Sequence, residues 1–280
     1  MSDVVGHVVA DAADVLVIQP EDGPTVRIER RDVTAAREVP PPPVRPASSP
    51  EKLRRMLGEH WPGVETARLG GWVLHAGHGF TRRANSTLIA GDPGVNEDDG
   101  LAQVRAWYAA RGLDATLQRL GPAPAGHEDG ETVTLVGDLR SMVLDAEQVD
   151  PTWTDEPTAD WLAVWRGGGH HGVHERAVLT AAPGRYGVVC SDGVPVGCVR
   201  VDLDRRWAHV SCVEIAPRAR RRGVGRAITV AALQAARVWE PATSFAAVEC
   251  LTSNAPAIAL YESLAMREHH RYHYVPLELS

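Results

Sequence analysis

Arg220-Arg221-Arg222-Gly223-Val224-Gly225 stands between the apolar run of residues 210–216 and a helical pattern over residues 226–239. This order predicts a strand, a tight glycine turn and a helix. A helix that begins here presents unpaired backbone N–H groups and a partial positive charge at its first turn, and both attract anions. Gly223 and Gly225 carry no Cβ, so a diphosphate can lie directly against the main chain.

The spacing R-x-x-G-x-G after a short strand resembles the acyl-CoA signature of the GNAT N-acetyltransferase superfamily. Two other phosphate-binding motifs are absent, because the dinucleotide fingerprint needs G-x-G-x-x-G and a P-loop needs Gly-Lys-Ser/Thr. The resemblance implies that backbone amides from Arg221 to Arg226 hold the pyrophosphate of acetyl-CoA. It also implies that main-chain groups around Val213 and Ile215 pair with the pantetheine amides as an added strand would. The alternative is a solvated charge run or a nucleic-acid patch made by these arginines.

A second segment, Asn254-Ala255-Pro256-Ala257-Ile258-Ala259-Leu260-Tyr261-Glu262, reads as a short helix with a capping residue at its start and a proline in its first turn. Asn254 and Tyr261 are about two helical turns apart and so lie on similar sides. In the GNAT superfamily the similar pattern N-x-x-A-x-x-L-Y-E supplies an Asn near the pantetheine arm and a Tyr near the thioester sulfur. A phenol with a pKa of about 10 can protonate a departing thiolate, so Tyr261 is the general-acid candidate. The alternative is an ordinary amphipathic tyrosine whose ring packs and whose hydroxyl faces water.

Glu214 interrupts the second strand of a hairpin predicted over residues 195–204 and 207–215. By two-residue alternation its side chain points opposite to those of its neighbours. A carboxylate there can act as general base toward a substrate ammonium, directly or through water, especially if burial raises its pKa. An ion pair with a nearby arginine is an equally good interpretation. His209 is a weaker candidate for the base.

Composition limits the class of protein. The chain has 280 residues, 44% hydrophobic and 23% charged, which is typical of a soluble globular protein with two or three domains. We expect it to be cytoplasmic, because no apolar run approaches the roughly 18 residues of a membrane helix and the N-terminus lacks a signal-peptide pattern. The net charge of −7 argues against general nucleic-acid binding. We expect no metal, and the cysteines, which show no CxxC spacing, are predicted to be buried reduced thiols: Cys190, Cys198, Cys212 and Cys250.

The chain divides into four segments of different composition. Residues 1–39 hold short strand-like runs and suggest a small SH3-like β segment, and residues 40–50 read as a stiff Pro-rich linker. Residues 51–145 resemble the front of a GNAT domain without its glycine turn, which indicates a degenerate repeat, and residues 146–280 are predicted to be the catalytic GNAT domain. The expected elements before the catalytic domain are helices over 50–60 and 97–111 and strands over 6–10, 14–19, 25–29, 71–76, 84–91, 116–120 and 132–139.

The stretch from Gly70 to Ser86, with Trp107 to Gly112, resembles an actinobacterial group of multi-domain GNAT proteins, in which an SH3-like barrel precedes a GNAT-like half and a catalytic half. Some members are labelled N-acetylglutamate synthase or histone acetyltransferase-like. The resemblance implies an α/β protein of the GNAT fold, a mixed central sheet flanked by helices, preceded by a degenerate GNAT-like half and a small β-barrel-like segment.

These motifs predict an acetyl-CoA-dependent N-acetyltransferase that transfers an acetyl group to a primary amine by direct attack within a ternary complex. The partner expected is a small-molecule or peptide amine, with no membrane and no nucleic acid. Its pocket is expected among loops such as Gly167 to Gly172, with Trp161 and Trp165 as further candidates. The alternative function is a catalytically weak acyl-CoA-binding regulatory protein, which the additional N-terminal segments favour because small barrels often bind partners.

Overall fold

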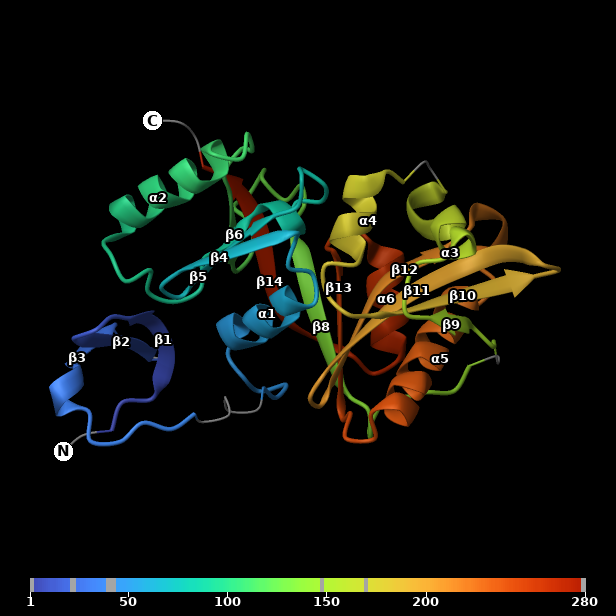
Figure 1. The fold of residues 1–280 in the computed structure, drawn as a ribbon. Coiled ribbons are helices and arrows are strands. Elements are labelled where there is room, and N and C mark those ends of the chain that lie inside the picture. Colours follow the sequence, from blue (N-terminus) through green and yellow to red (C-terminus); the bar gives the residue numbers. More distant parts are fainter. Residues whose placement is uncertain (1–2, 21–23, 39–43, 147–148, 169–170, 278–280) are drawn as a thin grey trace. The chain divides into compact units, whose positions relative to one another are not determined.

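The computed structural model describes residues 3–20, 24–38, 44–146, 149–168 and 171–277. Its elements form two compact units, each assembled from stretches that are separate in the sequence (Figure 1). The first unit comprises residues 1–43, 63–120 and 274–280, and the second comprises residues 44–62 and 121–273.

The N-terminal stretch of the first unit forms its own antiparallel sheet of β1 (Gly6–Asp11), β2 (Val15–Pro20) and β3 (Val26–Glu29). The three strands predicted here are confirmed. Residues 21–23, between β2 and β3, lie outside the described residues. An SH3-like barrel stays a prediction.

The rest of the first unit consists of four strands and one helix. The strand order is β4 (Glu65–Leu69), β5 (Trp72–Ala76), β6 (Thr87–Leu88) and β7 (Thr116–Leu120), and the helix is α2 (Glu97–Ala109). Asn96 caps α2, because its side-chain oxygen accepts the N–H of Asp99 at 2.9 Å. The core combines apolar side chains of sheet and helix: Trp72, Leu74, Val104, Tyr108 and Leu117. The predicted helix over 97–111 and the strands over 71–76 and 116–120 are thus confirmed.

The strand predicted over residues 84–91 is wrong in its first part. A 3-10 turn, Arg83–Asn85, stands there, and β6 has only two residues. The amide of Asn85 explains the difference, because it holds four main-chain groups of the preceding loop and so draws the chain away from a sheet. Those groups are the N–H of Gly77 and Gly79 and the carbonyls of Phe80 and Thr81. Strand β4 was not predicted, because its sequence ETARL holds only two apolar residues, too few for a clear alternation.

The second unit is built on a mixed sheet. Its strands are, in spatial order, β14 (Arg267–Pro276, of which residues 267–273 belong to this unit), β8 (Thr132–Asp138), β13 (Phe245–Leu251), β12 (Trp207–Ile215), β11 (Val194–Asp204), β10 (Arg185–Ser191) and β9 (Thr152–Thr154). Only the contact between β12 and β13 is parallel, and the other registers are antiparallel. The predicted hairpin and the strand over 132–139 are confirmed.

Helices cover both faces of this sheet (Figure 1). On one face, α5 (Val224–Trp239) and α6 (Ala255–Ser263) pack in a core with residues such as Val199, Val210 and Val248. On the other face, α1 (Pro50–Glu59) packs on Trp207 and Ala247. There too, α3 (Ala159–Val164) contributes Trp161 against Tyr186, whose hydroxyl donates to the last carbonyl of α4 (Val173–Leu179). The fold is the predicted α/β arrangement of a mixed sheet flanked by helices.

The compact units cut the chain differently from the predicted segments. Helix α1 and strand β8 lie in the second unit, as does the boundary between residues 145 and 146, where the catalytic domain is predicted to start. Residues 40–43 of the expected linker lie outside the described residues, and its second half is folded: Val44 is buried and accepts the indole N–H of Trp207 at 2.9 Å, and Ser49 caps α1. The predicted domain bounds stay a prediction.

Among the described residues, no helix has the length and apolar character needed to cross a membrane.

Candidate active site

Strands β12 and β13 separate along their length. They pair as parallel strands from Trp207–Phe245 to Val210–Val248, and the described residues beyond contain no further pair between them, although both strands continue. A β-bulge marks the separation, because Cys212 has a φ of 52° and the register with β11 shifts here. A bulge bends its strand and increases the local twist, which turns β12 away from β13.

The separation leaves one edge of β12 without a strand beside it. The N–H of Ala216 donates to the carbonyl of Val196 on β11 at 2.9 Å. Because main-chain groups alternate in direction along a strand, those of Glu214 also face β11, whereas those of Val213 and Ile215 face away from it. The two residues predicted to offer their main chain to pantetheine therefore present it at the edge that faces β13.

The glycine turn leads directly into α5. Gly223 occupies the N-cap position with a φ of 78°, and no atom lies within 4 Å of the point where a Cβ would stand. Gly225 also has a packing role, because a Cβ there would lie 3.1 Å from Cδ1 of Leu260 on α6. Its glycine lets the two helices approach, and the first N–H groups of α5 are left open beside Gly223.

The arginines of the turn divide into two groups. Three of them bind carbonyls of the protein: Arg218 donates to Pro195 at 2.8 Å, Arg220 to Ile215 at 3.0 Å and Arg226 to Val143 at 3.2 Å. Arg221 and Arg222 are exposed, and Arg221 has a left-handed φ of 58°. Arg218 and Arg220 fix the turn to the ends of β11 and β12, and Arg226 binds the loop after β8. Arg220 thereby occupies one main-chain acceptor, the carbonyl of Ile215, that the sequence assigns to pantetheine.

Tyr261 is buried on α6, on the face of the sheet that α5 also covers. Burial raises the pKa of its phenol, and the thiols of Cys250 and Cys212 raise it further. These two thiols come from β13 and β12, beyond their last pair. The phenol therefore lies near the region where the strands separate, and it is protonated at neutral pH, as a proton donor must be.

Glu214 contacts the loop that follows α3. Burial raises the pKa of its carboxyl, while hydrogen bonds from the backbone N–H groups of Arg166 and Gly167 and the charges of Arg166 and Arg220 lower it. These donors belong to the 3-10 turn Trp165–Gly167. The same contacts fit both interpretations of Glu214, a base in the site and a partner of arginine.

Three further residues predicted for the site have mainly structural contacts. Asn254 is exposed and caps α6, because its side-chain oxygen accepts the N–H of Ala257 at 3.2 Å. Trp161 and Trp165 are buried, and the indole of Trp161 donates to the carbonyl of Val199 at 2.9 Å. Within the acceptor loop expected over Gly167 to Gly172, the ring of His171 lies 4.9 Å from that of Trp165, while residues 169–170 lie outside the described residues.

The thiols are free, as predicted, but not all are buried, because Cys190 is exposed near the end of its strand. Burial raises the pKa of the Cys212 and Cys250 thiols to about 11 each, and it also raises the pKa of Cys198. Thiols with such a pKa are protonated at neutral pH and are poor nucleophiles.

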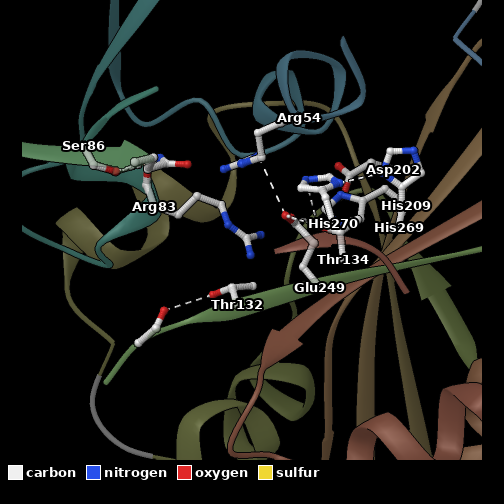
Figure 2. Close-up of polar contacts among 12 residues, drawn as sticks. Arg54, Arg83, Ser86, Thr132, Thr134, Asp202, His209, Glu249, His269 and His270 are labelled. Atoms are coloured by element: carbon white, nitrogen blue, oxygen red, sulfur yellow. Dashed lines mark hydrogen bonds and ion pairs between the residues drawn. The ribbon is translucent and has the colours of Figure 1, made fainter. Parts of the chain in front are cut away.

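A buried polar cluster on the α1 side of the sheet was not predicted as a unit (Figure 2). Arg54, Asp202, His209 and Glu249 come from α1, β11, β12 and β13, and each side chain is at most 1% exposed. Glu249 lies 3.9 Å from Nη1 of Arg54 and 3.6 Å from Nε2 of His209, whose Nδ1 lies 3.9 Å from Asp202. His209, the weaker base candidate, is thus fully enclosed between two carboxylates. The sequence signal for this cluster was a charged residue, Glu249, within an apolar strand. That signal does not identify Arg54 on α1 as its partner.

The arrangement fits acetyl-CoA. An open helix N-terminus, a free strand edge and a protonated phenol all belong to the region around the separation of β12 and β13. Among the described residues, no group of three or more His, Cys, Asp or Glu side chains is arranged to hold a metal ion.

Known proteins match the chain over most of its length. A family model described as "Probable histone acetyltransferase Rv0428c C-terminal" matches residues 51–275. The protein named "Probable histone acetyltransferase Rv0428c" from Mycobacterium tuberculosis (strain ATCC 25618 / H37Rv) is 30% identical over 301 residues, covering 99% of this chain and 90% of its own.

Two solved structures share the fold. A GCN5-related N-acetyltransferase from Kribbella flavida matches with a TM-score of 0.56 and 17% identity, over 81% of this chain and 94% of that chain. A tandem GNAT protein from the clavulanic acid biosynthesis pathway matches with a TM-score of 0.52 and 13% identity, over 70% of this chain and 76% of that chain. With the family match and the mycobacterial relative, they show that this chain belongs to the GNAT superfamily of N-acetyltransferases, in the family of the probable histone acetyltransferase Rv0428c C-terminal region.

Proposed function

We propose that the protein transfers an acetyl group from acetyl-CoA to a primary amine by direct attack within a ternary complex. The observation that carries this proposal is the place of Tyr261, a buried phenol on the face of the sheet that α5 and α6 cover. Its pKa is raised by burial and by the thiols of Cys212 on β12 and Cys250 on β13, both of which lie beyond the last pair of these strands. Burial keeps this phenol protonated at neutral pH, so it holds a proton for the departing thiolate.

Acetyl-CoA would supply the acetyl group as a thioester. Its pyrophosphate would bind the first N–H groups of α5 together with the residues Arg220, Arg221, Arg222, Gly223, Val224, Gly225 and Arg226. Val213 and the N–H of Ile215 would pair with the pantetheine amides, and the Asn254 side chain would lie along the same arm. The N-cap position of Gly223 supports this assignment, because nothing occupies the space in front of the helix there.

Two different side chains carry out the two proton transfers of the reaction. Tyr261 gives its proton to the thiolate that leaves. A carboxylate on the opposite face of the sheet, with Glu214 as the candidate that the sequence predicts, takes a proton from the acceptor ammonium. A route through a covalent cysteine is disfavoured, because the thiols beside Tyr261 stay protonated at neutral pH.

The acceptor is proposed to be the amine of a small molecule or peptide. The mycobacterial relative is named a probable histone acetyltransferase, so a basic peptide belongs among the first compounds to test. We also propose that the enzyme is soluble and cytoplasmic and that it needs neither a membrane nor nucleic acid.

The test is CoA release by the purified full chain, with acetyl-CoA and a panel of amino acids, polyamines, aminoglycosides and basic peptides. Amine-dependent release supports the proposal and identifies the class of acceptor. Acetyl-CoA binding without release for any amine contradicts it, and favours an acyl-CoA-binding regulatory protein instead.

A further inference from the structure

Glu249 lies at the point where the sheet divides. It directly follows Val248, the last residue of β13 that pairs with β12. Val248 and Cys250 pack toward α5 and α6, so strand alternation directs Glu249 to the opposite face, where Ala247 packs on α1. Tyr261 and Glu249 therefore belong to opposite faces of the sheet at the same division.

A continuous line of hydrogen bonds leads away from Glu249 (Figure 2). The hydroxyl of Thr134 donates to Oε1 of Glu249 at 3.4 Å and also contacts Nε2 of His270 at 3.3 Å. Nδ1 of His270 lies 2.8 Å from Nδ1 of His269, whose Nε2 lies 3.0 Å from the carbonyl of Ser48. His269 is only partly buried, whereas His270 is 7% exposed, so the line runs from the interior to the surface.

Several charged or titratable groups lie around Glu249 on its face of the sheet. They are Arg54 and His60 from α1 and its end, His209 from β12 and His270 from β14, with Asp202 behind His209. The Cys250 thiol, on the same strand but the other face, interacts with Glu249 only through its charge. Arg54 favours the ionised carboxylate. Burial lowers the pKa of His270 to about 4, so at neutral pH this imidazole is uncharged and can pass a proton without retaining it.

We propose that Glu249 accepts a proton from the acceptor ammonium and that Thr134, His270 and His269 conduct this proton to solvent. The inference rests on the proposed acetyl transfer. The ammonium N–H bond breaks and its proton passes to the Glu249 carboxylate, which frees the nitrogen lone pair to form the C–N bond while the C–S bond breaks. Of the two protons that the amine loses overall, one balances the proton that Tyr261 gives to sulfur, and the other leaves along this line.

Acid and base then act from opposite faces of the sheet. The arrangement keeps the proton donor for sulfur apart from the proton acceptor for nitrogen, so neither can neutralise the other. Glu214, which already accepts two backbone N–H groups, would hold the acceptor loop on the same face as Glu249.

The test compares His270→Gln with His273→Gln in the full-length protein. Both histidines lie on β14 with nearly equal exposure, 7% and 8%, but the imidazole of His273 contacts the carbonyl of Gly121 instead of the line. Glutamine at position 270 can keep a hydrogen bond to Thr134 but cannot relay a proton. We measure kcat and KM from pH 6 to 9 with the amine that the panel identifies, and acetyl-CoA affinity by calorimetry.

We expect His270→Gln to lower kcat about tenfold near pH 7, with the loss shrinking toward pH 9, because more of the amine then arrives already deprotonated. Acetyl-CoA affinity should not change, and His273→Gln should behave as the wild type. Glu249→Gln should lower kcat by about 100-fold or more at neutral pH. If the Glu249→Gln variant does not fold, the comparison of His270→Gln with His273→Gln still tests the proton line.

Equal losses in both histidine variants, or a wild-type pH profile for His270→Gln, would overturn the proton line while leaving the acetyltransferase intact. Absence of amine-dependent CoA release from the wild type would overturn the proposed function and the proton line with it.

Discussion

Arg200 and Asp202 form an ion pair inside the second unit, with 2.7 Å between Nη1 and Oδ2 and with both side chains at most 1% exposed. The same guanidinium donates to the carbonyls of His60 and Ala182, at 3.0 Å each, and to the hydroxyl of Tyr186 at 3.2 Å. One side chain thus joins the end of α1 and the segment before β10 to the sheet.

We therefore expect Arg200→Met to destabilise the protein by about 3–5 kcal/mol, because it leaves the carboxylate of Asp202 buried without its cation. The free energy of unfolding in urea measures the effect. Arg205→Met is the matched control, since Arg205 is 47% exposed and lies 3.7 Å from Asp204, and we expect it to cost less than about 1 kcal/mol. Equal effects of the two substitutions would show that the buried pair has no special importance.

Tyr261→Phe removes only a buried hydroxyl on the face of the sheet that α5 and α6 cover. We expect kcat to fall by about 100-fold, because the thiolate loses its proton donor, while acetyl-CoA affinity stays within about twofold of the wild type. Turnover and calorimetric titration measure the two effects. Unchanged turnover would remove Tyr261 from the mechanism, and a comparable loss of acetyl-CoA affinity would show a binding role.

The parts of the site that the sequence predicted lie close together in the chain. The glycine turn and the Asn254-to-Tyr261 helix are contiguous motifs, and each can be recognised without knowing what packs on it. The bulge at Cys212 could not be recognised in this way, because its left-handed φ belongs to an ordinary non-glycine residue.

The buried cluster was missed for a different reason. Glu249 and His209 stand out as polar residues in apolar strands, but their partner Arg54 comes from a helix that the sequence assigned to another segment. A single charged residue in a buried strand indicates that a polar or charged partner exists, but it does not indicate which residue that partner is. Strand β8 shows the same limit, since its own residues predict a strand but not its place between β13 and β14.

Gly223→Ala tests the anion site at α5. An alanine Cβ meets no atom there, so the substitution introduces only left-handed strain, about 1–2 kcal/mol, and a methyl group in front of the helix. Gly193 is the matched control, because it has a φ of 73° and equally open surroundings in the hairpin of β10 and β11. We expect both alanine variants to lose similar stability, but only Gly223→Ala to weaken acetyl-CoA binding. If Gly223→Ala and Gly193→Ala bound acetyl-CoA with equal affinity, the pyrophosphate would have to bind at another place.

His60 makes the stability of the fold depend on pH. Its ring stacks on His209 at 5.3 Å, neither ring nitrogen has a hydrogen-bond partner in the described structure, and burial lowers its pKa to about 4 from 6.5. Between these values the unfolded state binds the proton and the folded state does not. Its contribution is therefore complete above pH 6.5 and is lost as the pH falls to 4, by up to about 1.4 kcal/mol per pH unit.

We expect His60→Phe to flatten the decline of unfolding free energy between pH 6.5 and 4, with His270 still contributing its own share. His127→Phe, at an exposed position, should leave the slope unchanged. Urea unfolding at several pH values provides the comparison. A His60→Phe curve parallel to that of the wild type would mean that another group titrates.

Glu214→Gln distinguishes an anchor for the acceptor loop from a general base. The carboxylate accepts the backbone N–H groups of Arg166 and Gly167, whereas an amide offers one oxygen and an NH₂ group that would face these donors. We expect the amine KM to rise roughly tenfold, consistent with about 1–3 kcal/mol for an unsatisfied donor, and the shape of the kcat pH profile to stay unchanged. Amide exchange at Arg166 and Gly167 should quicken, while Glu262→Gln, an exposed change on α6, should alter neither property. A fall in kcat that recovers at high pH would instead make Glu214 the proton acceptor and displace Glu249 from that role.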